Sequence, residues 1–270
     1  NLQKKNTFRL RKTLILVDNK AENTASIDEW NCLSEQFDSD LINPGTEKQL
    51  PSKNYEIIII HHSINPMNFY YLPFHWLNYL KNFNGLKVMF SQDEYRRIDL
   101  KCELIKNLNI HILFSTLSTK NIKIVYKNLK KKKNFYIYKY YPGFFRSKNF
   151  NFKVPRISER KKHIIYRGKP FGSEMGNISR KKELIGKLIN RKFKNTLNLD
   201  ISSNLEKRVY TEWLKFNCEG KSTLCTYGGS EIYDFDENII NKINFLRKKG
   251  LKENAIYKLI KKEEVKKKTY

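Results

Sequence analysis

Short apolar runs alternate with amphipathic stretches along the first 140 residues of the chain. The runs are rich in Ile, Leu, Val or aromatic residues, and polar residues follow them; they lie at 13–17, 55–61, 86–90, 110–114 and 135–141. Such runs are typical of strands that are buried on both faces of a parallel sheet. Some of the intervening stretches carry apolar residues at helical spacing. The alternation therefore predicts a parallel sheet with helices on both faces.

A polar, basic stretch that contains Pro155 separates this region from a second one of the same pattern. Beyond it, strands are predicted at 163–166, 196–201 and 222–226, and helices at 181–189 and 205–216. We predict an N-terminal Rossmann-like domain over 1–150, a linker over 151–162 and a partial second Rossmann-like domain over 163–270. The second domain is expected to be partial, and the protein to be truncated at its C-terminal end, because a doubly wound domain has about five or six strands.

The chain is strongly basic, with a formal net charge of +26, and Lys far outnumbers Arg. A basic surface favours nucleic acid, anionic membrane or phosphorylated ligands as partners. Much of the excess of lysine is also explained by lysine-rich faces that are exposed to solvent. The runs Lys130–Lys133 and Lys266–Lys268 have few aromatic residues among them, which favours solvated faces or weak contact with anionic lipid. No specific nucleic-acid partner is therefore expected.

Cysteine usage and hydropathy indicate a reduced, cytoplasmic protein. No apolar run approaches the roughly 18 residues that a membrane span needs. The four cysteines form no Cys-x-x-Cys pair, and no histidine lies at metal-ligand spacing from them. We expect no structural zinc and no metal at the site.

Polar residues follow two of the predicted strands, where α/β sheets bind their ligands. His61 and His62 end one strand, and either could act as a general base for a hydroxyl group or be a polar loop residue packed under a helix. Gln92, Asp93 and Glu94 end the next strand, where they would line a cleft or pair with nearby cations.

The turn Arg167-Gly168-Lys169 lies between a predicted strand and a predicted helix that carries Lys182 near its start. Backbone N–H groups and cations at such a turn can bind phosphate, although a solvated surface turn has the same sequence. Further on, Gly228, Gly229 and Ser230 permit either close approach of a ligand or a plain turn. Asp234-Phe235-Asp236 is expected to be a structural acidic turn.

Several stretches resemble one group of bacterial glycosyltransferases of the GT-B fold, the family-one-type enzymes of surface polysaccharide biosynthesis. They are Gly85–Tyr95, Tyr166–Pro170, Ile185-Gly186, Tyr210–Phe216 and Gly229–Asp236. The resemblance implies two facing Rossmann-like domains, with the acceptor on the first and a nucleotide-sugar on the second, and usually no metal. It matches Arg167 and Lys182 to the basic pair near the donor diphosphate. The family's ribose-binding glutamate would follow after the last residue of this sequence.

The leading hypothesis is a glycosyltransferase that moves a sugar from a nucleotide-diphosphate-sugar to a hydroxyl of a glycan or lipid-linked acceptor. His61 or Asp93 would orient or deprotonate the acceptor, and Arg167, Lys169 and Lys182 would offset the charge of the leaving diphosphate. The nucleotide-sugar is a co-substrate, and no other cofactor is expected. The enzyme would be cytoplasmic, with peripheral contact to the inner membrane left open. The alternatives are a basic nucleic-acid-binding α/β protein and a non-catalytic transferase remnant.

Overall fold

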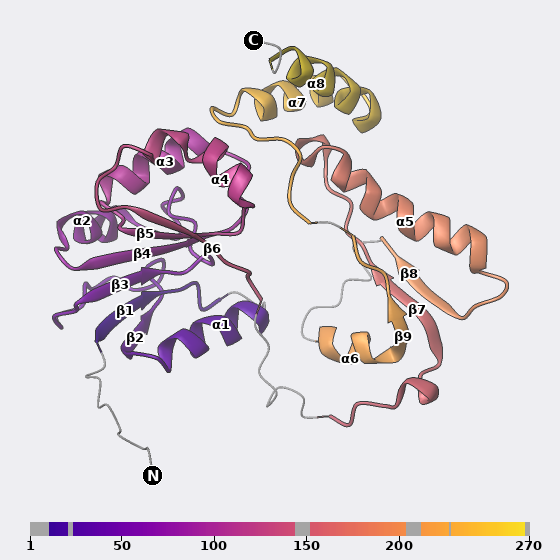
Figure 1. Ribbon diagram of the computed structural model, residues 1–270, viewed down its shortest axis with the longest axis horizontal. Helices are drawn as coiled ribbons and strands as arrows, with labels where there is room; N and C mark the ends of the chain where they lie inside the picture. The colour runs from indigo at the N-terminus through magenta and orange to yellow at the C-terminus, as the bar shows by residue number, and fades with distance from the viewer. Residues whose placement is uncertain (1–10, 21–23, 144–151, 204–211, 227, 268–270) are drawn as a thin grey trace. The chain divides into compact units, whose positions relative to one another are not determined.

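The computed structural model of the protein describes residues 11–20, 24–143, 152–203, 212–226 and 228–267 (Figure 1). These residues divide into two compact units. The first unit ends near residue 143 and lacks only a short segment, residues 95–98, which groups with the second unit. Among the described residues, no helix combines the length and the apolar character needed to cross a membrane.

The first unit contains a six-stranded, wholly parallel sheet in the order β2-β1-β3-β4-β5-β6. The strands are β1 (Lys12–Leu16), β2 (Asp38–Ile42), β3 (Ile57–Ile60), β4 (Leu86–Ser91), β5 (Ile112–Ser115) and β6 (Tyr136–Lys139). The parallel α/β sheet predicted from the apolar runs is confirmed, and its topology is Rossmann-like. The apolar runs were predictive because a strand with neighbours on both sides and helices over both faces has no surface left for polar side chains.

Helices flank this sheet: α1 (Thr24–Ser34), α2 (Phe74–Asn82), α3 (Ile98–Asn107) and α4 (Thr119–Val125), followed by the short 3₁₀ helix η1 (Lys127–Leu129). Figure 1 shows α1 on one side of the sheet and α3 and α4 on the other. This placement follows from right-handed crossovers, because the step from β1 to β2 runs in one direction along the sheet and the steps from β4 to β5 and from β5 to β6 run in the other. Trp76, Leu80 and Cys102 are buried, as their helical spacing predicts.

One core cluster of the first unit joins α1 to the central strands. It consists of Ile15, Val17, Trp30, Ile59, Val88 and Phe90. Burial of each large apolar side chain contributes about 1.5–3 kcal/mol, so this packing fixes α1 against the sheet. Because Trp30 is part of the cluster, the residue before it, Glu29, is brought to the same end of the sheet.

Strand β2 was not predicted from the sequence. It reads Asp-Ser-Asp-Leu-Ile and pairs only with β1 at the edge of the sheet. Asp40 accepts hydrogen bonds from Lys53 at 2.9 Å and from the Tyr55 hydroxyl at 2.7 Å. An edge strand keeps one side in water and is often charged, so its sequence lacks the apolar run that marks a central strand.

The strand order reverses between β1 and β3. From β1 the backbone moves to β2 on one side, and the following strands β3 to β6 extend the sheet on the other side. The connections that follow β1 and β3 therefore run in opposite directions along the sheet. In open α/β sheets this topological switch point is the usual place for a ligand.

The second unit has a three-stranded parallel sheet in the order β8-β7-β9. Its elements are η3 (Ile157–Glu159), β7 (Lys162–Arg167), η4 (Ser173–Met175), α5 (Asn177–Phe193), β8 (Leu199–Ser202), α6 (Trp213–Glu219), β9 (Gly220–Thr223), α7 (Asn238–Lys248) and α8 (Glu253–Lys267). Helix α5 begins four residues before the predicted helix at 181–189, and β9 lies slightly before the predicted 222–226. The first part of the helix predicted at 205–216, with Tyr210, lies outside the described residues.

The Asp234-Phe235-Asp236 stretch starts helix α7. The Asp234 carboxylate accepts from the backbone N–H groups of Ile239 and Ile240 at 3.3 and 2.9 Å, and Asp236 accepts from the N–H of Asn238 at 3.2 Å. These are the N–H groups that a helix start leaves without intrahelical partners. The two aspartates therefore have the structural role expected for them.

Candidate functional site

Polar residues meet at the switch point, where β1, β2 and β3 end. The Asp18 backbone N–H donates to Ser63 Oγ at 3.0 Å, which joins the end of β1 to the end of β3. Asn43, after β2, donates from Nδ2 to Asp18 Oδ1 at 3.2 Å and to Asn19 Oδ1 at 2.8 Å. These bonds hold the three strand ends in fixed positions around the histidines that follow β3.

His61, His62 and Glu29 form a compact cluster at this edge. The His61 ring is 0% exposed, and its Nε2 lies 3.7 Å from Glu29 Oε1. His62 Nδ1 lies 3.8 Å from the same carboxylate oxygen. The two imidazole rings are tilted against each other with their centroids 4.0 Å apart. A carboxylate and two imidazoles, contributed by α1 and by the residues after β3, thus converge on one small volume.

The other nitrogens of the two rings have defined neighbours. His61 Nδ1 accepts the backbone N–H of Ser63 at 3.1 Å and lies 3.0 Å from Ser63 Oγ. His62 Nε2 lies 3.2 Å from Ser26 Oγ, and its Nδ1 lies 3.3 Å from the Tyr140 hydroxyl. Trp30 meets the His61 ring edge-on, with centroids 5.5 Å apart. Hydrogen bonds and ring packing therefore fix the orientation of both histidines.

Burial and neighbouring groups shift the pKa values of Glu29 and His62. Burial works to raise the pKa of Glu29, but His61, His62 and the Gly143 backbone N–H together lower it below its usual value. Burial, followed by the effect of His61, lowers the pKa of His62 to about 4, against the opposing effect of Glu29. Near neutral pH, an ionised carboxylate therefore faces a neutral His62 ring.

Two atoms of the cluster lack hydrogen-bond partners. Among the described residues, neither Glu29 Oε2 nor His61 Nε2 has a partner, although both atoms are buried. An unsatisfied buried polar group costs about 1–3 kcal/mol, and native structures retain few of them. Such an arrangement can bind an ion or a small polar ligand between the side chains.

The sequence interpretation found only part of this site. It named His61 and His62 as site candidates, but it named neither Glu29 nor Tyr140 as one. These residues come from distant stretches. The only local signal was a carboxylate directly before Trp30 on a helix next to the sheet, and that signal is weak without the tertiary contacts.

The residues after β4 are arranged differently. Glu94 is 3% exposed, and its Oε2 accepts from Ser115 Oγ at 3.1 Å and from Thr116 N and Oγ1 at 3.0 and 3.1 Å. The Tyr126 hydroxyl donates to its other oxygen. Glu94 was expected to line a cleft, but its carboxylate is used within the protein. The reason is that donors from β5, its loop and the end of α4 all converge on it.

Asp93 and Gln92 lie closer to the surface. Asp93 is exposed, with a φ of 51°, and Gln92 is half-buried. Aspartate tolerates this left-handed backbone conformation better than most residues. Of the two neighbouring carboxylates, that of Asp93 is therefore presented to solvent, while that of Glu94 is buried.

The cation that ends β7 is already paired. The Arg167 guanidinium forms two bonds to Asp200, from Nη1 to Oδ1 at 2.8 Å and from Nη2 to Oδ2 at 2.9 Å. It also stacks on Phe216, 4.3 Å from the ring centroid. Arg167 was expected to bind a diphosphate directly. In this structure its guanidinium group instead pairs with Asp200 of β8 and stacks on Phe216 of α6.

Two lysines, one after β7 and one in α5, approach the same aromatic ring. Lys169 Nζ lies 5.2 Å and Lys182 Nζ lies 4.7 Å from the centroid of the Phe171 ring. Lys182 lies in the second turn of α5, because the helix starts earlier than predicted. A Cβ on Gly168 would be only 2.3 Å from the Tyr166 hydroxyl oxygen, so the packing of Tyr166 explains the glycine.

The Gly228-Gly229-Ser230 stretch forms a turn. Gly228 and Gly229 are exposed, and Gly229 has a φ of 89°. Ser230 Oγ accepts the backbone N–H of Ile232 at 3.0 Å and donates to the Ile232 carbonyl at 2.8 Å. Local hydrogen bonding of this kind accounts for the plain-turn interpretation. Tyr227 lies outside the described residues.

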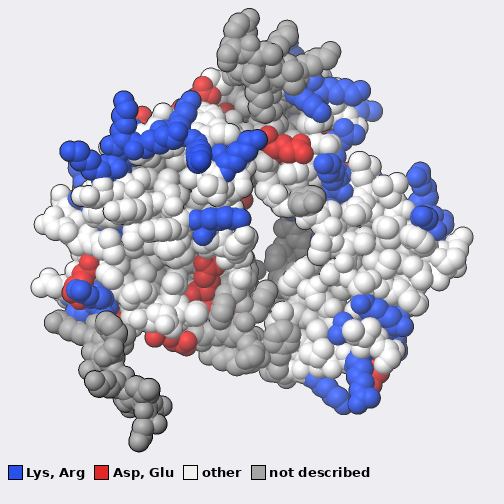
Figure 2. Space-filling view, viewed as in Figure 1, with Lys and Arg blue, Asp and Glu red and all other residues white. Residues whose placement is uncertain are grey.

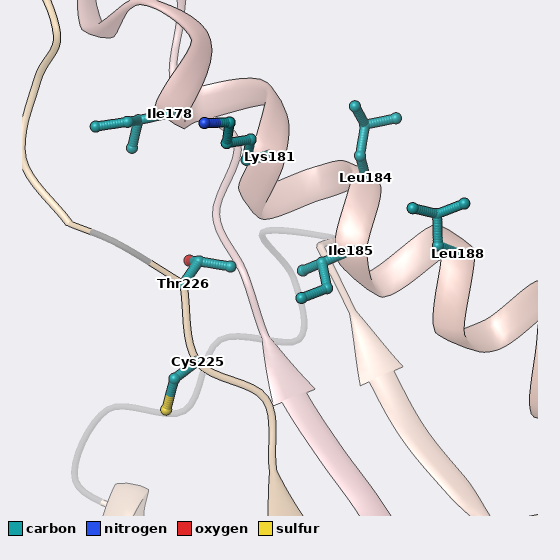
Figure 3. Close-up of a pocket in the computed structure, with 7 residues that line it drawn as sticks. All are labelled: Ile178, Lys181, Leu184, Ile185, Leu188, Cys225 and Thr226. Carbon is teal, nitrogen blue, oxygen red and sulfur yellow. The ribbon is translucent and has the colours of Figure 1, made fainter.

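A cavity of about 700 Å³ lies along α5 in the second unit. Helix α5 contributes Ile178, Lys181, Leu184, Ile185 and Leu188, and the residues after β9 contribute Cys225 and Thr226 (Figure 3). The lining is largely apolar, with one cation. It differs in chemistry from the polar edge of the first unit and from the Lys169–Lys182 pair.

Lysines gather on one part of the first unit. Figure 2 shows Lys and Arg side chains over α3 and α4. The exposed residues of this basic patch are Lys106, Lys120, Lys123, Lys127, Lys130, Lys131 and Lys133. They belong to the helical side of the sheet and do not line the switch point.

The fold and the site stand without a recognised relative. No protein-family model, no curated protein and no solved structure gives a significant match to the sequence.

Proposed function

We propose that the protein is a glycosyltransferase that moves a sugar from a nucleotide-diphosphate-sugar to the hydroxyl of a glycan or lipid-linked acceptor. The observation that carries the proposal is the pair of ammonium groups, Lys169 and Lys182, that approach one Phe171 ring directly after strand β7. Lys169 follows β7 and Lys182 lies in the second turn of α5, and two cations near one helix start favour a ligand with two or more negative charges. The resemblance to GT-B transferases in the same stretch supports a diphosphate as that ligand.

In this proposal, the lysines stabilise the charge that develops on the leaving diphosphate. Arg167 contributes indirectly, because its bonds to Asp200 hold the end of β7 against β8. The acceptor binds at the polar edge of the first unit, and the two units face each other during transfer.

Asp93 is the proposed general base for the acceptor hydroxyl. It presents an exposed carboxylate at the end of β4, whereas His61 is 0% exposed and cannot touch an acceptor without rearrangement. His61 is therefore assigned a positioning role through Ser63, which lies 3.0 Å from its ring. General-base catalysis of this kind contributes about 10²–10⁴ in rate.

Donor binding tests the proposal. Calorimetric titration of the protein with UDP- and GDP-sugars should show saturable binding, and the double variant Lys169→Gln/Lys182→Gln should weaken it at least about tenfold, since each charged hydrogen bond is worth about 1.5–3 kcal/mol. The matched control is Lys192→Gln, which removes another exposed lysine of α5. If neither class of donor binds, or if the control loses as much affinity as the double variant, the proposal is wrong.

The base assignment has a separate test. Asp93→Asn should lower kcat for transfer by about 10²–10⁴ and leave donor affinity unchanged. Asparagine accepts the same left-handed backbone conformation, so the turn is retained. Unchanged turnover would remove Asp93 from the mechanism.

A cytoplasmic enzyme with a lipid-linked acceptor would meet the membrane surface, and the basic patch around α4 offers a means of contact. Each lysine near an anionic surface contributes about 1 kcal/mol at low ionic strength. Vesicles that contain phosphatidylserine should bind the protein, and binding should fall when Lys130–Lys133 are replaced by Gln. Equal binding to neutral vesicles would exclude this electrostatic contact.

A further inference from the structure

We propose that Glu29, His61 and His62 form a binding site for one divalent transition-metal ion, such as Zn²⁺, at the switch point of the first unit. The three residues each present a possible ligand atom, and these atoms all lie within 4.8 Å of one another. The inference rests on this cluster alone and does not depend on the proposed glycosyl transfer.

The spacing is close to that of a metal site. Zinc binds histidine nitrogen at about 2.0–2.1 Å and carboxylate oxygen at about 2.0–2.2 Å, which places neighbouring tetrahedral ligands roughly 3.3–3.5 Å apart. Glu29 Oε1 is already 3.7 Å from His61 Nε2 and 3.8 Å from His62 Nδ1. These two separations need to shorten by only a few tenths of an ångström, and the two histidine nitrogens lie within 4.8 Å of each other. Both separations are too long for hydrogen bonds, so direct pairing of these atoms contributes little.

The atoms without partners point to a ligand between the side chains. Among the described residues, His61 Nε2 and Glu29 Oε2 are buried and have no hydrogen-bond partner. His61 is fully buried, so bulk water does not reach its nitrogen. One cation bound between the rings and the carboxylate would satisfy both groups together, and it would also offset the buried negative charge.

Metal binding requires one proton to move. At present His61 Nδ1 accepts from the Ser63 N–H, which places the ring proton on Nε2. With metal on Nε2, the proton belongs on Nδ1, and Ser63 Oγ, 3.0 Å away, can accept it. The loss of one hydrogen bond is a small cost compared with the free energy that zinc supplies when it binds to protein ligands. The tautomer change is therefore small beside the free energy of metal binding.

The serine hydroxyl groups next to the second ring nitrogen of each histidine also fit a metal site. Ser26 Oγ lies 3.2 Å from His62 Nε2 and can accept its proton, which leaves the Nδ1 lone pair to bind the metal in place of the Tyr140 hydroxyl, 3.3 Å away. Ser63 has the equivalent position behind His61. Metal-binding histidines usually donate their second ring N–H to such an oxygen.

The donor set selects the class of metal. Two imidazoles and one carboxylate suit Zn²⁺ and related first-row ions, whereas Mg²⁺ and Ca²⁺ prefer oxygen ligands. Three protein ligands leave at least one coordination position for water or another ligand. The side chains of Glu29 and His62 are 12% and 6% exposed, so the cluster retains limited access from the surface.

Metal titration of the tag-free, chelator-treated protein tests the site. Calorimetry with ZnCl₂ should show one equivalent bound, and Co²⁺ should give the visible absorption of a low-symmetry site with imidazole ligands. Glu29→Gln and His62→Gln should each weaken zinc at least about 100-fold, since loss of an outer-shell partner alone costs about 10–100-fold. The matched control is His75→Gln, which removes an exposed histidine of α2 and should leave the affinity unchanged.

Three results would overturn the inference. They are no zinc binding by the protein, zinc binding that survives both site variants, and equal loss of binding in the His75 control. Circular dichroism of each variant identifies any that fail to fold, and Co²⁺ absorption of the wild-type protein then decides the matter by itself. The assay contains no nucleotide-sugar, so failure of this site and failure of the proposed transferase activity are separate outcomes.

Discussion

Two carboxylates near the ends of adjacent strands of one sheet have opposite surroundings. After β4, the Glu94 carboxylate accepts from two hydroxyl groups and a backbone N–H on one oxygen and from the Tyr126 hydroxyl on the other. Near the end of β3, Glu29 Oε2 has no partner among the described residues, and its other oxygen faces two imidazoles at 3.7 and 3.8 Å.

The difference distinguishes a carboxylate that stabilises the fold from one that can bind a ligand. A buried carboxylate with all its hydrogen bonds made joins the elements around it and has little capacity for a ligand. A carboxylate and a histidine with buried atoms unsatisfied raise the free energy of the ligand-free state, which a bound cation would lower. The same residue type at the same edge of one sheet thus supports two different roles.

Removal of Glu94 gives the largest expected effect. Glu94→Ala should lower the free energy of unfolding by about 3–5 kcal/mol, because Lys101, which is buried nearby, loses the carboxylate that offsets its charge. Glu29→Ala in the metal-free protein should cost less, because among the described residues its Oε2 has no hydrogen bond to lose. Urea denaturation of both variants measures the contrast. Equal losses would mean that the two carboxylates have the same role.

The stability gained on zinc binding should depend on Glu29 and not on Glu94. At a free concentration of 100 times Kd, the ion should raise the free energy of unfolding of the wild-type protein by about 2.7 kcal/mol. Glu29→Gln should abolish this gain, whereas Glu94→Gln should retain it on a lower baseline. Thermal unfolding with and without ZnCl₂ tests both variants. A gain that depends on Glu94 would place the ion elsewhere.

Two tyrosines provide a matched pair for hydrogen bonding. Tyr126→Phe removes a buried donor to the Glu94 carboxylate and should cost about 1.5–3 kcal/mol. Tyr140→Phe removes a 3.3 Å contact to the neutral His62 ring and should cost about 0.5–1.5 kcal/mol. Denaturation midpoints of the two variants, at an unchanged dependence of the unfolding free energy on denaturant, measure the two losses of stability. A larger loss for Tyr140 would contradict the assignment of the stronger network to β4.

The smallest expected effect belongs to Asp93. Asp93→Asn should keep the free energy of unfolding within about 0.5 kcal/mol, because the side chain is exposed and asparagine tolerates the 51° φ. The same variant is expected to impair transfer strongly. A large loss of stability would show that Asp93, like Glu94, serves the fold.

The central strands of the first unit and one edge strand, β6, could be predicted from the sequence, but the other edge strand, β2, could not. Apolar runs identified β1, β3, β4 and β5 because these strands are buried by neighbours on both sides. Strand β2, with its aspartates, has no such run and becomes a strand only through pairing with β1. Local sequence carries the burial pattern of a strand, whereas the pairing partner is a property of the whole sheet.

For the candidate sites, the position of a residue in the sequence did not indicate whether its side chain can reach a ligand. The sequence predicted that His61, Glu94 and Arg167 lie at strand ends, and they do. Whether each side chain is exposed, satisfied or already paired depends on residues far away in the sequence. Asp200 engages Arg167, and the donors after β5 engage Glu94.

The sequence by itself determined the alternation of strands and helices, the polar strand ends and the presence of two histidines after β3. Only the tertiary structure brought Glu29 from α1 to those histidines and left two buried atoms without a hydrogen-bond partner among the described residues. The physical reason is that burial periodicity is encoded residue by residue along an element. The coordination of side chains from different elements is fixed by packing, here by Trp30 in the core beneath α1.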